Sequence, residues 1–325
     1  MTRLVERDRV AGVRSPKSLG VVRYVDDLAL AMGELGVDYR PAVRPSTGLG
    51  VHLHLANSSR TVLLHAAGMR APFVVTVHDV LPRTAALRLC YRGAVYPLLR
   101  RAAATIVHSE FAATLLARLG ASPRRLEVIP HSVRTFASLD QQAAQQTLGW
   151  EGNRPLFVLP GVLKPAKLVA ETLAAAAPLL ERGTIRLALV GPIVDEGLAR
   201  RARALGALVL PSPTRRLYEQ AIVAADCVLV LRDGSVGETN GPLMDALGAG
   251  RDVLATAVGS IREIADYAAV YCRPTAASIR AGLATLCDDD ERVCHAETAR
   301  ARALAFSVRS IAQRHADLFG EVLDG

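Results

Sequence analysis

Two glycine-containing loops carry the residues best suited to binding an anion. Each loop follows a short apolar run and precedes a helical pattern. Backbone N–H groups at a helix N-terminus favour a bound phosphate, and nearby lysines add charge of the right sign. Both loops are therefore candidate phosphate sites. Their residues with suitable chemistry are Gly161, Lys164, Lys167, Glu238, Thr239, Asn240, Gly241, Pro242 and Asp245.

Lysine is scarce in this chain, so its placement is informative. Lys17, Lys164 and Lys167 are the only lysines, and two of them flank Pro165. Proline suits the first turn of a helix, so both cations are expected beside a helix N-terminus. There they oppose the helix dipole by about 0.3–1 kcal/mol each. A bound anion would relieve that cost, whereas two solvated surface lysines are the alternative.

The second loop precedes a helix predicted to open at Pro242. Glu238 lies just before this helix, and Asp245 lies one turn into it. A carboxylate at this place can complement the dipole or cap the helix without any ligand. The alternative is that both carboxylates accept hydrogen bonds from a ligand, and the sequence leaves both open.

Three histidines of the first half, His78, His108 and His131, each end or directly follow a predicted strand. Ligands of open parallel sheets bind beyond the carboxyl ends of the strands, and imidazole can bind substrate or transfer a proton. A satisfied polar residue at the edge of the core is the alternative for each. His52, His54 and His65 lie in no motif for which a function can be argued.

Short apolar strands alternate with helical stretches throughout, which predicts parallel sheets of the doubly wound kind. In the first half, the predicted strands are Val51–Leu55, Phe73–Val77, Thr105–Val107 and Leu126–Ile129, and an opening strand is hard to see. The predicted helices are Val21–Gly33, Ala85–Tyr96 and Glu110–Leu119. The second half has predicted strands Leu156–Leu159, Arg186–Val190, Leu208–Leu210, Cys227–Leu231, Val253–Ala257 and Val270–Cys272.

The two series of elements indicate two Rossmann-like domains that face an interdomain cleft. We assign residues 1–138 to an N-terminal acceptor domain and residues 139–305 to a C-terminal donor domain, with the polar segment 134–154 as the linker. The final helix, within residues 306–325, is expected to pack back on the first domain. A chain of 325 residues is long enough for two such cores.

Composition excludes several classes of protein. The formal net charge of +8 favours anionic partners, but only 4% of the residues are aromatic and no nucleic-acid reading module is present. The five cysteines have no paired spacing, and Asp288–Asp290 is best interpreted as a helix cap, so no metal site is predicted. No secretion signal or membrane-spanning run is visible. We therefore expect a cytoplasmic protein.

The motifs resemble those of the retaining glycosyltransferases of family 4. GETNGPLMDALGAG is similar to the family branch that reads GETSG before an apolar helix. GVVRYVDDLALAM, VVTVHDVL, ATIVHSEFAA and VIPHSV follow in family order. The chain departs from the family in the six residues between Glu238 and Asp245, in the first loop, where the paired glycines are reduced to Leu19-Gly20, and in the missing arginine of the donor loop.

The resemblance implies a GT-B fold, a nucleotide diphosphate sugar as donor, retention of configuration, and neither metal nor other cofactor. By family position, Lys167 binds the diphosphate, Glu238 holds the sugar and Asp245 the ribose, while His78 lies near the transferred sugar. His78, Glu238 and Lys167 are thus the implied catalytic residues. The acceptor side is assigned to Ser18, Gly20, His78, His108 and His131.

Other functions stay open at this point. The departures from the family motifs favour a nucleotide-sugar binding or partner subunit that has lost catalysis, and a GT-B epimerase is a further alternative. The acceptor is a glycan, a lipid-linked sugar or a small molecule. A lipid-linked acceptor would suit a peripheral contact at the inner face of a membrane through Arg88, Arg92, Arg100 and Arg101, against the alternative of an ordinary surface helix interrupted by Pro97.

Overall fold

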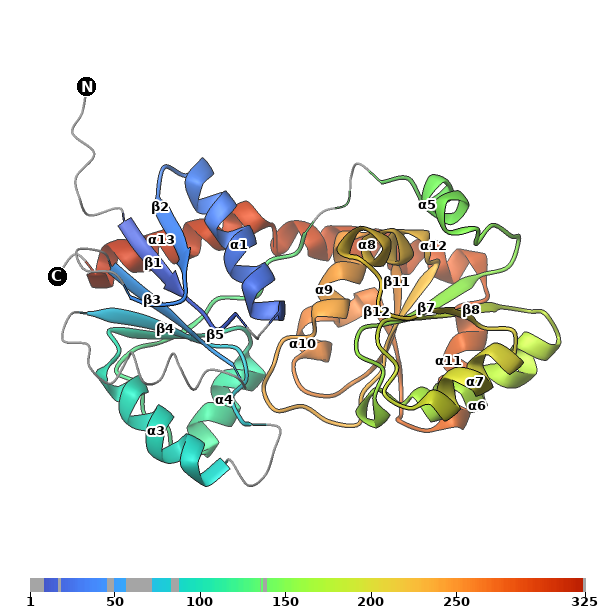
Figure 1. The fold of residues 1–325 in the computed structure, drawn as a ribbon, viewed down its shortest axis with the longest axis horizontal. Coiled ribbons are helices and arrows are strands. Elements are labelled where there is room, and N and C mark those ends of the chain that lie inside the picture. Colours follow the sequence, from blue (N-terminus) through green and yellow to red (C-terminus); the bar gives the residue numbers. More distant parts are fainter. Residues whose placement is uncertain are drawn as a thin grey trace. The chain divides into compact units, whose positions relative to one another are not determined.

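The computed structural model describes residues 9–16, 19–45, 50–56, 72–82, 88–134, 136 and 139–323, which fold into two α/β units (Figure 1). The first unit contains the described residues up to Ser132, the segment Val236–Thr239, and the described residues from Phe306 onward. The second unit contains the described residues of Val133–Ser235 together with Asn240–Ala305. Each unit has its own sheet and its own apolar core.

The first unit is built on a six-stranded parallel sheet with the order β2-β1-β3-β4-β5-β6. Its strands are β1 (Arg9–Val13), β2 (Asp38–Ala42), β3 (Gly50–Leu55), β4 (Phe73–Val77), β5 (Ala104–Val107) and β6 (Leu126–Val128). Its helices are α1 (Leu19–Glu34), α3 (Arg88–Arg101), α4 (Glu110–Arg118) and α13 (Val308–Leu323).

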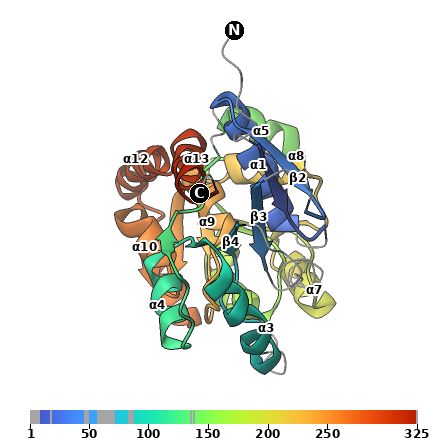
Figure 2. The same cartoon turned by 90° about the vertical axis from the view of Figure 1, so that its left-hand side faces the viewer.

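The helices of the first unit cover both faces of its sheet. α1 and α13 pack on one face, while α3 and α4 pack on the other, as Figures 1 and 2 both show. The alternation of side chains along each strand creates the two faces. In β4, Phe73, Val75 and Val77 face α3 and α4, whereas Val74 faces α1 and α13.

The second unit repeats the architecture with the strand order β12-β11-β10-β7-β8-β9, again all parallel. Its strands are β7 (Leu156–Pro160), β8 (Arg186–Val190), β9 (Leu208–Leu210), β10 (Cys227–Val230), β11 (Asp252–Thr256) and β12 (Ala269–Cys272). Its helices are α5 (Gln141–Leu148), η3 (Pro165–Lys167), α6 (Val169–Glu181), α7 (Glu196–Ala204), α8 (Arg215–Ala224), α9 (Gly241–Gly248), α10 (Ile261–Ala265), η4 (Asp266–Ala268), α11 (Ala276–Thr285) and α12 (Asp289–Ala305). Two parallel, helix-covered sheets confirm the predicted fold class.

Four local predictions need correction. An opening strand does exist, and the unpredicted strand β2 lies at the edge of the sheet, where its polar residues and Pro41 are tolerated. Helix α3 continues past Pro97 to Arg101 instead of being interrupted. The polar segment 134–154 contains a helix, α5, which begins after the capping side chain of Asp140 and ends at the left-handed Gly149.

Gly12 allows a side chain to cross the first sheet. It lies on β1, between β2 and β3, and a Cβ atom at this position would lie only 2.4 Å from the hydroxyl oxygen of Tyr39. The ring of Tyr39 therefore passes over β1 and places its hydroxyl group against His52 and His54 of β3. Any larger residue at position 12 would block this path.

Gly12→Ala is expected to lower the unfolding free energy of the first unit by about 1–3 kcal/mol, because the methyl group must displace the Tyr39 ring. Gly33→Ala is the matched control, since a Cβ at this position of α1 meets no atom within 4 Å. The control should be neutral or should stabilise by up to about 1 kcal/mol. Urea unfolding of both variants measures the difference, and equal stabilities would contradict the crossing.

Candidate functional site

The loop after β7 places a buried lysine at the carboxyl end of its strand. Lys167 is only 7% exposed, and its ammonium group donates a hydrogen bond of 3.5 Å to the carbonyl of Pro160. Pro165 begins a 3₁₀ turn, because the fixed φ of proline suits the first turn of a helix. Leu168 follows in the left-handed conformation, with φ 54°, before α6 begins. Such a conformation costs of order 1–3 kcal/mol, and residues held this way cluster at binding sites.

The loop after β10 ends in a capped helix N-terminus. Asn240 is the N-cap of α9, and its side-chain oxygen accepts a hydrogen bond of 3.3 Å from the N–H of Leu243. This bond fixes the orientation of the amide. The Nδ2 group of Asn240 is buried and finds no acceptor among the described residues. A buried amide donor without an acceptor costs about 1–3 kcal/mol, which a ligand oxygen would recover.

Within the second unit, Gly161 lies close to both Lys167 and the first turn of α9. A Cβ atom at this position would lie 3.6 Å from Nζ of Lys167 and 3.7 Å from the Cγ atom of Pro242, the second residue of α9. Gly161 has φ +97°, a conformation that favours glycine. The structure thus brings together the predicted residues Gly161, Lys167 and Pro242, with Lys164 as the N-cap of the 3₁₀ turn.

The carboxylates of the second loop both bind groups of the protein. Glu238 is buried, and its Oε2 atom accepts a hydrogen bond of 2.7 Å from the N–H of Val236. Thr239 beside it is half-buried. Asp245, which is also half-buried, accepts a hydrogen bond of 3.1 Å from the hydroxyl of Tyr218 in α8. The sequence did not indicate Tyr218 as a site residue, because Tyr218 and Asp245 lie in different helices, 27 residues apart along the chain.

On the acceptor side, Gly20 is the second residue of α1 and is exposed. Ser18 lies outside the described residues. His131 is half-buried, and its Nδ1 atom lies 2.8 Å from the carbonyl oxygen of Ser132. Of the three predicted histidines, His78 and His108 are buried, and their rings are in contact through a hydrogen bond of 3.2 Å.

The sequence analysis missed most of the polar cluster around His78. Both ring nitrogens of His78 are engaged, Nδ1 with His108 and Nε2 with Nδ1 of His54 at 3.1 Å. Other members come from elements that are far apart in the sequence. They are Tyr24 of α1, Tyr39 of β2, His52 of β3, Thr76 of β4 and His315 of α13.

Burial keeps these imidazoles neutral. It lowers the pKa of His108 to about 3 and that of His315 to about 4, because an imidazolium would lose its hydration. Desolvation, together with the neighbouring rings, holds the pKa of His52, His54 and His78 well below the ordinary value of 6.5. At neutral pH each ring therefore has one N–H donor and one acceptor.

Helix α3 has exposed arginines and buried apolar side chains. Arg92, Arg100 and Arg101 are exposed, whereas Val95 and Leu99 of the same helix are fully buried in the core. Among the described side chains of α3, Val95 and Leu99 therefore cover the sheet while the arginines face solvent. None of the helices in the described part of the chain combines the length and apolarity needed to span a bilayer.

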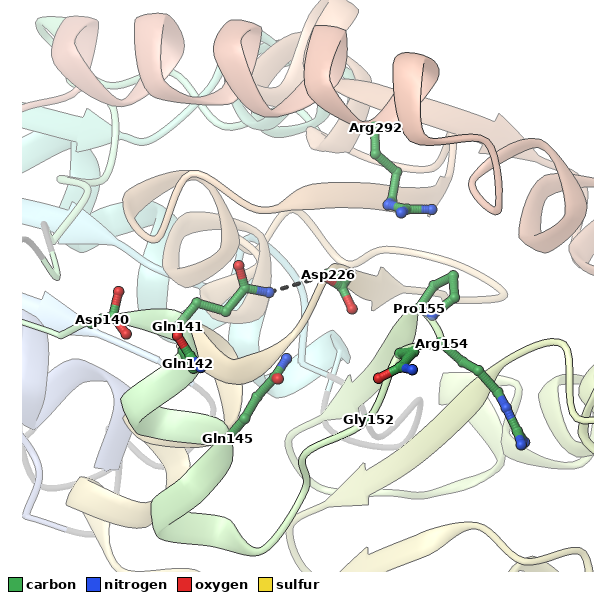
Figure 3. A pocket seen from close by; sticks show the side chains of 10 residues that line it. Asp140, Gln141, Gln142, Gln145, Gly152, Arg154, Pro155, Asp226 and Arg292 are labelled. Atoms are coloured by element: carbon green, nitrogen blue, oxygen red, sulfur yellow. Dashed lines mark hydrogen bonds between the residues drawn. The ribbon is translucent and has the colours of Figure 1, made fainter.

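A separate cavity of about 420 Å³ lies at the opposite end of the second sheet (Figure 3). It is lined by Pro155 and Asp226, which precede β7 and β10. Gln141 points at Asp226 and donates a hydrogen bond of 2.9 Å to it, while the second carboxylate oxygen accepts the N–H of Leu156 at 2.7 Å. These bonds fasten α5 to the sheet, so we assign the Asp226 carboxylate a structural function. Across the described residues, no group of three or more His, Cys, Asp or Glu side chains is arranged to hold a metal ion.

Comparisons with known proteins agree with this architecture. Residues 50–135 match the family model of Glycosyltransferase Family 4. No curated protein matches the sequence. The structure has the fold of GT-B glycosyltransferases, which confirms the expected fold.

Several solved structures resemble the whole chain. A glycosyltransferase from Rickettsia africae has 14% identity and a TM-score of 0.74, with 97% of this chain and 98% of that chain covered. Anabaena Alr3699/HepE in complex with UDP and glucose has 18% identity and a TM-score of 0.77, with 96% and 99% covered. The sucrose-phosphate synthase of Thermosynechococcus elongatus has 17% identity and a TM-score of 0.71, with 96% and 80% covered.

Proposed function

We propose that this protein is a glycosyltransferase that transfers a sugar from a nucleotide diphosphate sugar to an acceptor, with retention of the anomeric configuration. The observation that carries the proposal is the buried Nδ2 group of Asn240, which has no acceptor among the described residues and lies at the N-terminus of α9. This helix turn and the ammonium group of Lys167 share the space in front of Gly161.

The chemistry of sugar transfer matches these groups. The departing diphosphate develops negative charge, which preorganised N–H donors and cations stabilise. Lys167, the Asn240 amide and the first N–H groups of α9 would bind its oxygens. Glu238 orients the sugar in this proposal, and Asp245, held by Tyr218, accepts hydrogen bonds from the ribose. UDP is the first nucleotide to test, because HepE, which shares the fold, was crystallised with UDP and with UDP-glucose.

UDP is expected to bind without added divalent metal, and Asn240→Asp is expected to weaken this binding at least about tenfold, as loss of a charge-assisted contact does. The aspartate keeps the capping oxygen for Leu243 but replaces the amide donor by a negative charge that repels the diphosphate. Isothermal calorimetry in the presence of a chelator measures both expectations.

Asn153→Asp is the matched control, because this exposed residue lines the cavity at the other end of the second sheet. The control should bind UDP like the unchanged protein. Loss of all binding under chelation, or equal affinity of the two aspartate variants, would contradict the proposed site. GDP and ADP should be titrated in parallel to identify the base that the site prefers.

A binding subunit without turnover is the second candidate. The bond between Glu238 and the N–H of Val236 favours it, because one carboxylate oxygen already serves the protein itself. Slow hydrolysis of a bound nucleotide sugar separates the two functions, since a catalyst releases sugar without acceptor and a binding subunit does not. Analysis of the released sugar also detects an epimerase.

A further inference from the structure

One continuous chain of hydrogen bonds crosses the first sheet on the face covered by α1 and α13. It joins side chains from β2, β3 and β4 with three residues that directly follow strands. In order, its members are Thr76, His52, Tyr39, His54, His78, His108 and the backbone carbonyl of Ile129. The donor–acceptor distances along this order are 2.7, 2.9, 2.8, 3.1, 3.2 and 2.9 Å.

The last bond fixes the direction of all the others. A carbonyl oxygen only accepts, so the Nδ1 atom of His108 carries the proton, and its Nε2 atom must accept from Nδ1–H of His78. In a neutral ring the Nε2 atom of His78 then accepts from Nδ1–H of His54. If His78 were protonated at Nε2 instead, two lone pairs would face each other across the 3.2 Å contact with His108.

The same rule continues to the other end of the chain. Nε2 of His54 accepts from the hydroxyl of Tyr39, whose oxygen accepts from Nδ1–H of His52. Nε2 of His52 in turn accepts from the hydroxyl of Thr76. Every donor then has one acceptor, which satisfies polar groups that are all buried.

We propose that His108 is a positioning residue, which uses the Ile129 carbonyl to hold His78 as a neutral imidazole protonated at Nδ1. His54 completes the arrangement from the other side. Both nitrogens of His78 are thereby committed to the protein, so the ring cannot serve as a general base while the chain is intact. The proposal concerns the first unit alone and does not depend on the proposed donor site.

The rings around the hydrogen-bond chain are consistent with this arrangement. The ring of Tyr24 packs edge-on against His78 and His108, with centroids 5.1 and 5.2 Å apart. Its hydroxyl lies 3.0 Å from Nε2 of His315, and Nδ1 of His315 lies 2.8 Å from the carbonyl oxygen of Ile311. His315 is therefore also protonated at Nδ1 by the same reasoning. Among the described residues, His131 is a further titratable ring against the cluster, with its centroid 5.6 Å from that of His108.

Nitrogen-15 NMR of the full chain at pH 7.5 tests the proposal, since two-bond proton–nitrogen correlations distinguish the two neutral tautomers and the imidazolium. We expect His52, His54, His78 and His108 all in the Nδ1–H form, although free histidine favours Nε2–H in water. His78 found as the Nε2–H tautomer or as an imidazolium would overturn the proposal. This measurement needs no variant and no ligand.

Two variants then separate positioning from packing. His108→Asn removes the acceptor that faces His78, so a measurable fraction of His78 should change to the Nε2–H tautomer. His131→Asn alters a neighbouring ring outside the chain and should leave His78 in the Nδ1–H form. Backbone amide spectra show whether each variant is folded. A folded His108→Asn variant with His78 entirely in the Nδ1–H form would show that His108 does not set the tautomer.

Discussion

Between pH 7.5 and pH 5.5 the first unit is expected to lose at least about 3 kcal/mol of its unfolding free energy, which is the share of His108 and His315 alone. The cause is the burial of five neutral imidazoles, His52, His54, His78, His108 and His315, all of which have a lowered pKa. Whole domains are stable by only about 5–15 kcal/mol. The first unit should therefore lose a large part of its stability in mildly acidic solution.

The sign follows from proton binding. Below the ordinary pKa of 6.5 the unfolded chain protonates each imidazole, whereas the native rings stay neutral. Unfolding then takes up protons, so stability is fully present above pH 6.5 and falls by about 1.4 kcal/mol per ring for each pH unit below it. For His108 and His315 the loss is complete only at pH values of about 3 and 4, where the native rings protonate.

Amide hydrogen exchange of β3–β5 at several pH values measures the loss of unfolding free energy in the first unit. The fluorescence of the single tryptophan provides an internal comparison. Trp150 is buried in the second unit, so its fluorescence reports on that unit separately. Burial there raises the pKa of Asp252 to about 7, which has the opposite effect on stability under acidification. His315→Gln removes one titrating ring and should reduce the slope by about 1.4 kcal/mol per pH unit. Equal protection at pH 7.5 and 5.5 would contradict the prediction.

Lys167→Ala is expected to weaken binding of the diphosphate, whereas Glu238→Gln is expected to slow transfer of the sugar. Lys167→Ala should weaken UDP binding by about 1–3 kcal/mol, or roughly 5- to 150-fold, because it removes a charge-assisted contact with the diphosphate. Glu238→Gln should leave UDP affinity nearly unchanged and lower the rate of sugar transfer by about tenfold or more, since its carboxylate is assigned to the sugar. Calorimetry with UDP, followed by a transfer assay, provides both quantities.

The neighbouring lysine is the control for this pair. Lys164→Ala removes the same charge three residues earlier, at the N-cap of the 3₁₀ turn, and should cost less UDP affinity than Lys167→Ala. If Glu238→Gln loses UDP affinity as badly as Lys167→Ala, or keeps full activity, the division between phosphate and sugar is wrong. Glu238 would then serve the loop alone, through its bond to Val236.

The apolar strands of both sheets could be predicted because each is a nearly unbroken run of apolar residues. Phe73–Val77 and Arg186–Val190 have the predicted bounds, and nearly all of their residues are buried, so their apolar character is visible without structural knowledge. The edge strand β2 could not be found this way, because only Tyr39 of its five residues is buried. The position of β2 in the sheet depends on its pairing with β1 rather than on apolar residues of its own.

The loops proposed to bind the diphosphate were visible in local sequence, but the histidine chain was not. Loop glycines, lysines and a helix-opening proline lie close together along the chain, so Lys167 and Asn240 could be chosen directly. His52 and His54 alternate along a strand and therefore share one face. Their shared hydrogen-bond partner is Tyr39 of β2. The sequence did not predict β2, so it could not show that Tyr39 crosses Gly12 of β1 to reach both histidines.

The hydrogen-bond chain also bears on how the first sheet selects its strand register. A slip of two residues keeps every side chain on its original face. Valines and leucines recur at this spacing, so apolar packing alone distinguishes poorly between the native pairing and such a slip. The polar chain does distinguish the native pairing from the slip that places His54 opposite Val74, because that movement of β3 along β4 would separate His52 from Thr76 and His54 from His78. Buried imidazoles would then lose their partners, so misaligned sheets are disfavoured before any substrate is bound.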